Sequence, residues 1–484
     1  MSNDGRTRRT GVNVAVSIAG QLVGKAATLA WTLVAARELS ASAFGLFFYS
    51  YALAGLASAV SEWGFDPVLV EDVAHDRSVV RPAYTRAQAA QTVIALPAFA
   101  VAAIAAAISP SSPQDRIAVV LVCVAVLFDL WTDTARTVGV AVRNQLPTAR
   151  ALVIQRGTTA AIAIGVLVAG GGLLGLCSAF LAGSAIGIAS HVHALRSLGV
   201  RLQLDRATLS IRALWQTFLD CAVLGITVVV MVALFRLDAV LLGVIKGNVA
   251  VANYGVAYRL FESTLFLTFS VQGATFAAMA ASRDHGFVGR QVSRGFAIAG
   301  SVYAAFLAAC LVDAEGVLRL LYGGHYPQAS SGALRWLAGA PLCYLAGSLC
   351  TSALQAVRRR PLILASSLVA LAVNVALNLV LIPRMSGTGA ALATTASYAV
   401  LAAVALAGLA RAGVRIAVSR ELLAPVLTGG VMAGALLALP LPTIADIAVA
   451  AAVVAALWIA GLGGPRRAMS LIGRMGGSSP GEMP

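Results

Sequence analysis

Unbroken apolar runs of about 20 residues recur along almost the whole chain, and a run of that length spans the hydrocarbon core of a bilayer as an α-helix. The composition agrees with this pattern. Of the 484 residues, 59% are hydrophobic and only 11% are charged, whereas a soluble domain is about a quarter charged. An outer-membrane barrel would alternate apolar and polar residues instead. The sequence therefore predicts an all-α polytopic membrane protein.

A hydropathy window of about 19 residues gives fourteen candidate transmembrane helices. They lie near residues 12–36, 44–65, 87–109, 117–138, 150–170, 173–194, 218–244, 250–280, 293–313, 332–356, 361–382, 388–410, 422–440 and 444–463.

The positions of Lys and Arg support this count, because cytoplasmic connections carry the excess of positive charge. With the N-terminus in the cytoplasm, 25 basic residues fall on the cytoplasmic side, 5 on the outer side and 5 within spans. The asymmetry accounts for the net charge of +15 without a nucleic-acid partner. We therefore expect a multi-pass protein of the inner (cytoplasmic) membrane with both termini in the cytoplasm.

A weak internal repeat has an offset of 210 residues. Ala43-Phe44-Gly45-Leu46 opens the second span, and Asn253-Tyr254-Gly255-Val256 opens the eighth. Transporters often contain such repeats, although aromatic-glycine pairs also occur by chance at helix starts. The repeat predicts an N-terminal six-helix lobe over 1–205 and a C-terminal six-helix lobe over 206–412, around a central cavity. Two additional helices and a disordered tail would follow in 413–484.

Charged side chains within spans are costly in hydrocarbon and mark candidate functional sites. Lys25, Arg236 and Arg259 lie near the middle of the first, seventh and eighth spans. One interpretation is a cationic cavity that binds the anionic headgroup of a substrate. The other is that each cation pairs with a buried acid, such as Glu62, or Glu262 at i+3 from Arg259. Glu262 is also a candidate residue for ion coupling or gating.

A second group of charges lies toward the predicted cytoplasmic ends of the spans. Asp129 and Asp133 are one turn apart on the fourth span, with Arg136 beyond them, while Arg156 opens the fifth span and Asp220 the seventh. Buried carboxylates can titrate near neutral pH, so one interpretation is a proton or cation relay. The other, which we favour, is a cluster of salt bridges that locks an inner gate or the helix ends.

The sequence contains no motif for a cofactor, a metal or an enzymatic reaction. The six cysteines are scattered without a CxxC pair, and no Walker A motif is present. His191 and His193 are two residues apart on a helix and so point to different faces, which disfavours metal binding. We expect a transporter with no cofactor.

The connection 195–217 contains apolar residues among arginines, which predicts an amphipathic helix on the inner leaflet. Its apolar members are Leu204, Leu209, Ile211, Leu214 and Trp215.

Short stretches in three parts of the chain resemble Wzx-type polysaccharide flippases, in order and over roughly residues 10–412. They are Arg37–Phe47 for the first outer loop, Leu237–Gly243 and Val251–Leu260 for the seventh and eighth spans, and Asn378–Pro383 and Gly387–Thr394 for the eleventh and twelfth. The resemblance implies the multidrug/oligosaccharidyl-lipid/polysaccharide exporter superfamily. Its members have two six-helix lobes in a V that opens to alternate sides.

The resemblance also implies a substrate, a lipid-linked sugar moved from the inner to the outer leaflet for cell-surface polysaccharide biosynthesis. The partners would be a polyprenyl-diphosphate-linked glycan, membrane lipids, and a polysaccharide polymerase or glycosyltransferases. By similarity to the related MurJ-type flippases, Lys25 and Arg259 occupy the places of cations that hold the diphosphate. Those flippases usually carry arginine in the first span, and a lysine is a point charge without the bidentate fork of arginine.

Three other functions remain as alternatives. A multidrug or cation exporter of the same superfamily would need acids in its cavity, and Asp129 and Asp133 are the available ones. A peptidoglycan lipid II flippase would use the same cations as the polysaccharide flippase. A scaffold of an envelope-assembly complex would transport nothing.

Overall fold

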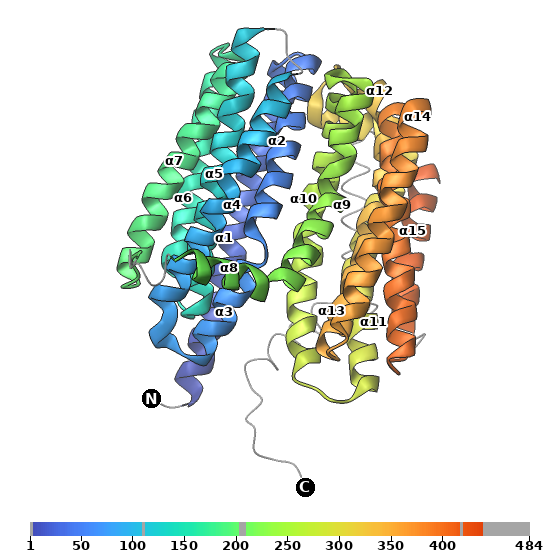
Figure 1. Cartoon of the computed structure of the whole chain (residues 1–484). Helices are drawn as coiled ribbons and strands as arrows, with labels where there is room; N and C mark the ends of the chain where they lie inside the picture. The colour runs from blue at the N-terminus through green and yellow to red at the C-terminus, as the bar shows by residue number, and fades with distance from the viewer. Residues whose placement is uncertain (1–2, 109–111, 203–209, 417–419, 439–484) are drawn as a thin grey trace. The chain divides into compact units, whose positions relative to one another are not determined.

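The structure is a computed structural model of the chain, and it describes residues 3–108, 112–202, 210–416 and 420–438. Within these ranges the protein consists of α-helices and one short 3-10 helix, without strands (Figure 1). Ten helical segments of this part are long and apolar enough to cross a membrane. The chain is therefore an all-helical, multi-pass membrane protein.

The chain divides into two compact units, Met1–Ala252 and Asn253–Pro484. The helices of the first unit are α1 (Asn3–Glu38), α2 (Ala41–Glu62), α3 (Phe65–His75), η1 (Arg77–Val79), α4 (Val80–Ile108), α5 (Pro113–Ala141), α6 (Leu146–Val168), α7 (Gly172–Ser197), α8 (Ile211–Asp220) and α9 (Ala222–Lys246). The helix α10 (Asn248–Ala280) begins at the end of the first unit and continues into the second. The second unit then contains α11 (His285–Tyr322), α12 (Pro327–Leu337), α13 (Ala340–Ala356), α14 (Arg360–Arg411) and α15 (Arg420–Ala438).

Local sequence signals set several of these boundaries. The Ser40 hydroxyl accepts a hydrogen bond from the backbone of Ala43 at the start of α2, and Ser112 caps α5 ahead of Pro113. Gly247 ends α9 and Gly323 ends α11, both with positive φ, a backbone conformation that glycine adopts without a steric cost.

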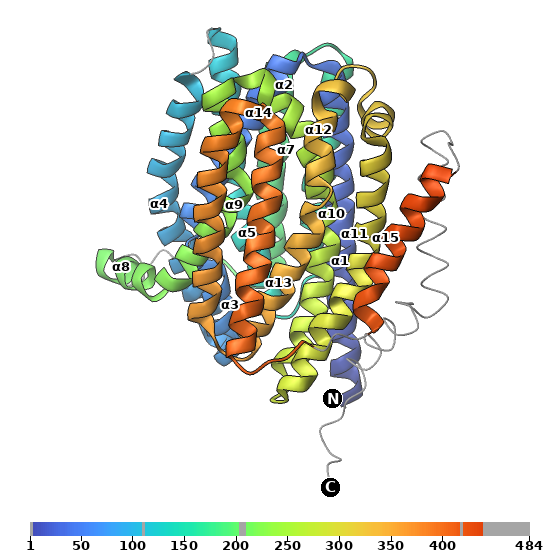
Figure 2. The same ribbon diagram turned by 90° about the vertical axis from the view of Figure 1, so that its right-hand side faces the viewer.

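Two long helices contain breaks that a hydropathy window predicts only in part. Ser386 has non-helical backbone angles inside α14, so this segment consists of two arms that fold back on each other (Figure 2). The arms correspond to the predicted spans 361–382 and 388–410. A second break lies at Asp313 in α11, at the end of the predicted span 293–313. The predicted span 332–356 is divided between α12 and α13.

The predicted total of fourteen spans and the lobe boundaries at 205 and 412 stay predictions. The predicted span 444–463 and the predicted disordered tail lie outside the described residues. Two residues of the predicted amphipathic helix, Leu204 and Leu209, also lie outside them. One assignment was wrong: Asp220 is the last residue of α8 and does not open a spanning helix. The hydropathy of α8 continues without a break into that of α9, so a hydropathy window does not detect the boundary between them at Cys221.

In the first unit, small residues bring two helices close together. Gly183 and Gly187 of α7 lie against Thr159 and Gln155 of α6, so that a Cβ at Gly183 would come within 2.7 Å of the Thr159 Cβ. Membrane helices pack through such small residues because the backbones can then approach. The close approach places Gln155 of α6 and Ser184 of α7 next to α5.

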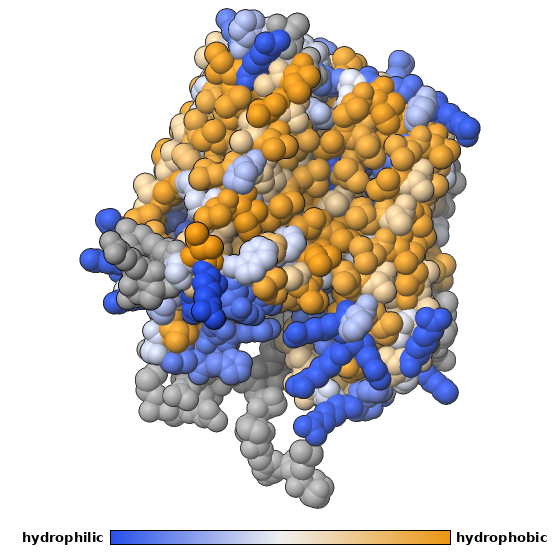
Figure 3. All heavy atoms as spheres, viewed as in Figure 1, coloured by the Kyte–Doolittle hydropathy of each residue, from blue (hydrophilic) through white to orange (hydrophobic). Residues whose placement is uncertain are grey.

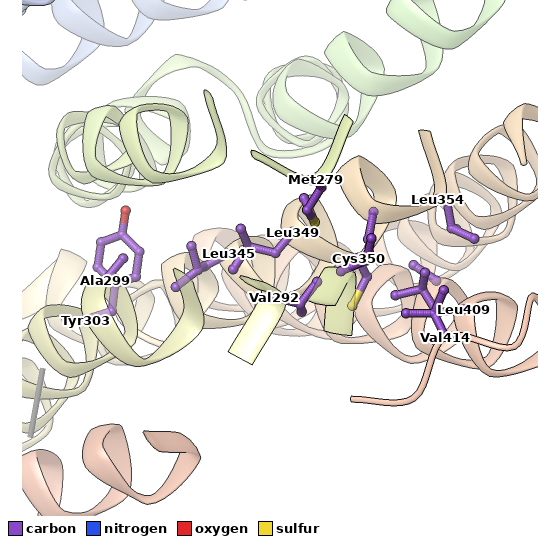
Figure 4. Packing of buried hydrophobic residues seen from close by; sticks show 13 residues of the cluster. Met279, Val292, Ala299, Tyr303, Leu345, Leu349, Cys350, Leu354, Leu409 and Val414 are labelled. Atoms are coloured by element: carbon purple, nitrogen blue, oxygen red, sulfur yellow. The ribbon is translucent and has the colours of Figure 1, made fainter. Parts of the chain in front are cut away.

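The core of the second unit is built from apolar side chains of α10, α11, α13 and α14 (Figure 4). Met279, Val292, Leu345, Leu349 and Leu409 belong to it and are buried. On the outside, apolar side chains cover α10 and α14 along most of their length, and hydrophilic side chains gather toward their ends (Figure 3). This distribution is the one expected of helices whose outer faces contact lipid.

Candidate functional site

A buried carboxylate organises the polar interior of the first unit. Asp129 of α5 is 7% exposed. Its Oδ1 accepts hydrogen bonds from Gln155 Nε2 and Ser184 Oγ, both at 2.7 Å, and its Oδ2 accepts one from Arg156 Nη1 at 2.9 Å. Three donors from two neighbouring helices therefore surround one carboxylate, which satisfies the condition for burying a charge.

Asp133 belongs to a separate set of contacts. It forms an ion pair with Arg136 at 3.1 Å, three residues along the same helix, and both side chains are partly exposed. Nearby, Thr137 Oγ1 donates to Asp66 Oδ2 of α3 at 2.7 Å. The two acids that the sequence placed one turn apart thus form their ion pairs with different arginines. The salt-bridge interpretation and the relay interpretation of this group both stay predictions.

Arg236 of α9, one of the three predicted substrate-binding cations, lies over an aromatic ring. The Arg236 guanidinium is 5.1 Å from the ring centroid of Tyr51, within the range of a cation–π interaction. One turn further along α2, Gly55 leaves room for this arginine, since a Cβ there would lie 3.5 Å from Arg236 Nε. Tyr51 also stacks on Phe47, with ring centroids 6.2 Å apart.

Lys25 and Arg156 come from neighbouring parts of the first unit. A Cβ at Gly24, the residue before Lys25, would lie 3.4 Å from Cγ of Arg156, so α1 and α6 meet there. The Lys25 side chain is exposed, and it makes no ion pair with any residue that the structure describes. The residue before Lys25 therefore lies against Arg156, whereas Arg236 contacts Tyr51 of α2.

In the second unit, Arg259 is held by an acid on its own helix. Its Nη1 donates to Glu262 Oε2 at 2.7 Å, and the two side chains are 7% and 18% exposed. Aromatic rings pack around this turn of α10, with Tyr258 and Phe261 in an edge-to-face contact at 5.3 Å between centroids. The structure thus pairs Arg259 with Glu262, the partner that the i+3 spacing suggested.

The sequence analysis missed Tyr51, which contacts the cation of α9. Its signal was hidden in the aromatic run Phe44–Tyr51, which is typical of packing residues. It also did not assign Gln155 and Ser184 as partners of Asp129, because neutral polar residues in a span have no distinctive spacing. In the part of the chain that the structure describes, no group of three or more His, Cys, Asp or Glu side chains is placed to hold a metal ion.

Comparison with known proteins decides the family. A family model described as "Polysaccharide biosynthesis protein" matches residues 11–281, which is more than half of the 484 residues. The chain belongs to this polysaccharide biosynthesis protein family. Membership confirms the resemblance to Wzx-type flippases that the short sequence matches indicated. No curated protein sequence matches the chain closely enough to count as a relative.

Solved structures of transporters share the fold of this polysaccharide biosynthesis protein. A lipid II flippase MurJ in an inward closed conformation aligns with a TM-score of 0.74 and 12% identity, over 91% of this chain and 97% of that one. An inward-facing multidrug resistance MATE family transporter of the MOP superfamily gives 0.63 and 14%, over 83% and 98%. A MOP superfamily transporter from Pyrococcus furiosus gives 0.61 and 13%, over 85% and 98%. At these identities the likeness establishes the fold, which is that of MOP superfamily transporters.

Proposed function

We propose that the protein is a flippase that moves a polyprenyl-diphosphate-linked oligosaccharide from the inner to the outer leaflet of the cytoplasmic membrane by alternating access. The family supports a role in polysaccharide biosynthesis, and the fold supports a transporter. The product would enter cell-surface polysaccharide synthesis, with a polymerase or glycosyltransferases acting before or after it. Both termini would lie in the cytoplasm, in agreement with the distribution of basic residues.

The observation that carries this proposal is Lys25. It is an exposed cation near the middle of the first predicted span, and it has no ion-pair partner among the described residues. Such a charge is unfavourable in hydrocarbon unless it faces water or an anion. A diphosphate headgroup supplies the anion, and the polyprenyl tail can stay in the lipid.

Arg259 would bind the headgroup by exchanging partners. Without substrate, Glu262 compensates its charge, so the buried guanidinium does not incur the cost of an isolated charge. A phosphate presents oxygens that a guanidinium can engage in bidentate hydrogen bonds. Substrate binding would therefore release Glu262, which would link headgroup binding to the charge state of this acid. Arg236 would contribute a further cation held in place by Tyr51.

The acids and Arg156 of the first unit would act as gate or coupling residues. Asp129 and Asp133 each pair with an arginine, so a change in either pair would alter how α5 packs on α6 and α7. The pairs fit a gate held by salt bridges better than a set of carboxylates available to a cationic drug.

Substitutions at Lys25 test the proposal. We expect Lys25→Ala to reduce the appearance of lipid-linked sugar in the outer leaflet by roughly tenfold or more, because one charge-assisted contact contributes about 1.5–3 kcal/mol. Lys25→Arg should keep much of the activity, since the charge survives. The amount of protein in the membrane is checked by immunoblot. Normal transport by Lys25→Ala, at normal expression, would contradict the proposed headgroup contact.

The likeness to MurJ favours one second candidate, a flippase for peptidoglycan lipid II. It would bind the same diphosphate and would respond equally to Lys25→Ala. The two are separated by substrate: complementation of a strain that lacks its lipid II flippase would support the second candidate, and complementation of a surface-polysaccharide defect the first. A multidrug exporter would instead tolerate Lys25→Ala and fail when Asp129 becomes Asn.

A further inference from the structure

The short helix α8 presents three different stripes of side chains. Ile211, Trp215 and Leu219 follow one another at intervals of four residues and are 87%, 60% and 48% exposed. Arg212, Gln216 and Asp220 form the adjacent stripe, which is polar and also exposed. Residues at this spacing lie on one face of a helix. An exposed apolar stripe beside an exposed polar one is typical of a helix at a boundary between water and lipid.

The third stripe, Leu214 and Phe218, packs α8 against the rest of the first unit. Phe218 stacks on Trp63 with ring centroids 4.5 Å apart, and Trp63 Nε1 donates a hydrogen bond to the Phe218 carbonyl at 3.1 Å. Leu214 packs on a buried cluster that includes Phe65 and Cys221. The helix therefore has a fixed orientation, and the exposure of its apolar stripe does not result from loose attachment.

The junction between α2 and α3, which contacts α8, has an unusual backbone conformation. Trp63 and Gly64 both have left-handed backbone angles at the junction of α2 and α3, with φ of 41° and 73°. For a tryptophan this region is sterically disfavoured. The indole also fits against Gly225 of α9, where a Cβ would come within 2.7 Å of the ring. The chain thus places an aromatic ring at the end of α2 as the support of α8.

The direction of α8 agrees with a position along a membrane surface. It runs across the long helices of the first unit, whereas those helices run side by side (Figures 1 and 2). It packs on α4, a spanning helix whose Val93, Leu96 and Val101 are exposed. Both α8 and the spanning helix on which it packs therefore carry exposed apolar side chains.

Basic residues at the start of α8 and in the chain before it match the charge of anionic lipids, whereas α8 ends at Asp220. Arg196, Arg201 and Arg212 are exposed, and Arg81 Nε donates to the Gly199 carbonyl at 3.0 Å, which fixes the turn after α7. Lys and Arg near a membrane surface are attracted to anionic headgroups. Opposite charge and a lipid-facing neighbour together favour a bilayer surface over a protein partner.

We propose that α8 is an anchor that binds the anionic surface of the membrane. Ile211, Trp215 and Leu219 insert between the headgroups and the start of the acyl chains, and Arg212 contacts lipid phosphates. The Trp63–Phe218 stack holds the helix parallel to the surface. This inference does not depend on which substrate the protein transports.

Cysteine variants of the full-length protein test the anchor. The six native cysteines are buried or half-buried, so a polar maleimide fluorophore should react mainly with a cysteine introduced at position 211, with wild type as the blank. The labelled Ile211→Cys protein is reconstituted in vesicles of phosphatidylcholine and phosphatidylglycerol that contain nitroxide-labelled lipid. We expect quenching by this lipid at least about twofold stronger than for Gln216→Cys, the matched position on the polar stripe. Leu219→Cys gives a second measurement on the apolar stripe if the first variant folds poorly.

Lipid charge provides the second measurement. Arg212→Gln should weaken quenching at position 211 in vesicles with phosphatidylglycerol and change it little in pure phosphatidylcholine. Equal quenching at positions 211 and 216 would overturn the proposal, because the apolar stripe would then lie no deeper in lipid than the polar stripe. A fluorophore at 211 that is shielded from water but not quenched by lipid would overturn it as well, because a protein or a second copy would then cover the stripe.

Discussion

The two units handle a cation inside the membrane in different ways. In the first unit, Arg156 shares Asp129 with the neutral side chains Gln155 and Ser184, and Arg236 lies over the ring of Tyr51. In the second unit, Arg259 is compensated by Glu262 on the next turn of the same helix. The first solution depends on how several helices pack, whereas the ion pair of the second joins two residues of one helix, α10. Charge in the first unit should therefore respond to helix movement, and charge in the second to its local partner.

Removing one member of the Arg259–Glu262 pair should have the largest effect. Glu262→Leu removes the carboxylate that pairs with a buried guanidinium, and we expect a loss of about 3–5 kcal/mol in the free energy of unfolding. Denaturant unfolding of the purified protein in detergent measures it. The double variant Arg259→Leu, Glu262→Leu should recover most of the stability. A double variant as unstable as the single one would show that the pair is not self-contained.

Asp129 and Asp133 give a matched test within the first unit. Asp129→Asn weakens the contact with Arg156 inside a buried network, for which we expect a loss of about 1.5–3 kcal/mol in unfolding free energy. Asp133→Asn affects a partly exposed pair on one helix, and the loss should stay below about 1 kcal/mol. The same denaturant titrations compare them. Equal losses would argue against the separation of the two networks.

Much of this arrangement could be predicted from the sequence, but only where it is local. Hydropathy located the long apolar helices up to residue 438 but not α3, and the i+3 spacing suggested the Arg259–Glu262 pair. The partners of Asp129 are 26, 27 and 55 residues away, and Trp63 contacts Phe218 across 155 residues. Contacts of this kind depend on which helices pack together, which periodicity does not encode. The ends of α8 were misplaced for the same reason.

The cation–π contact of Arg236 should contribute less than the Arg259–Glu262 pair or the buried contacts of Asp129. Tyr51→Leu removes the ring face, and we expect a loss of about 0.5–2 kcal/mol in unfolding free energy. Tyr51→Phe keeps the face and serves as the control. If both variants lose the same stability, the hydroxyl rather than the ring stabilises this part of α2.

The smallest effect concerns the start of α11, outside the spans. The Gly286 backbone N–H donates to Asp284 Oδ1 at 2.8 Å, and this hydrogen bond holds the pKa of Asp284 below its ordinary value. A depressed pKa in the folded state means that the carboxylate contributes stability above the unfolded pKa of about 3.9. That contribution is lost as the pH falls through the folded value.

Thermal unfolding at two pH values measures this contribution. Between pH 7 and the acid range, wild type should lose slightly more thermal stability than Asp284→Asn, which cannot titrate at this position. An identical loss in both proteins would show that the capping carboxylate contributes nothing to the pH dependence of stability.

The ring of Trp63 has a consequence for how related sequences can vary. It fills the space that the missing side chain of Gly225 leaves, while Gly64 passes so close to Leu224 that a Cβ would lie 2.8 Å from the Leu224 Cβ. A side chain at position 225 therefore becomes possible only when the residue at position 63 becomes smaller. In relatives that keep this junction, a larger side chain at position 225 should occur together with a smaller one at position 63. A homologue with a small residue at position 63 should lack the aromatic ring on which α8 packs.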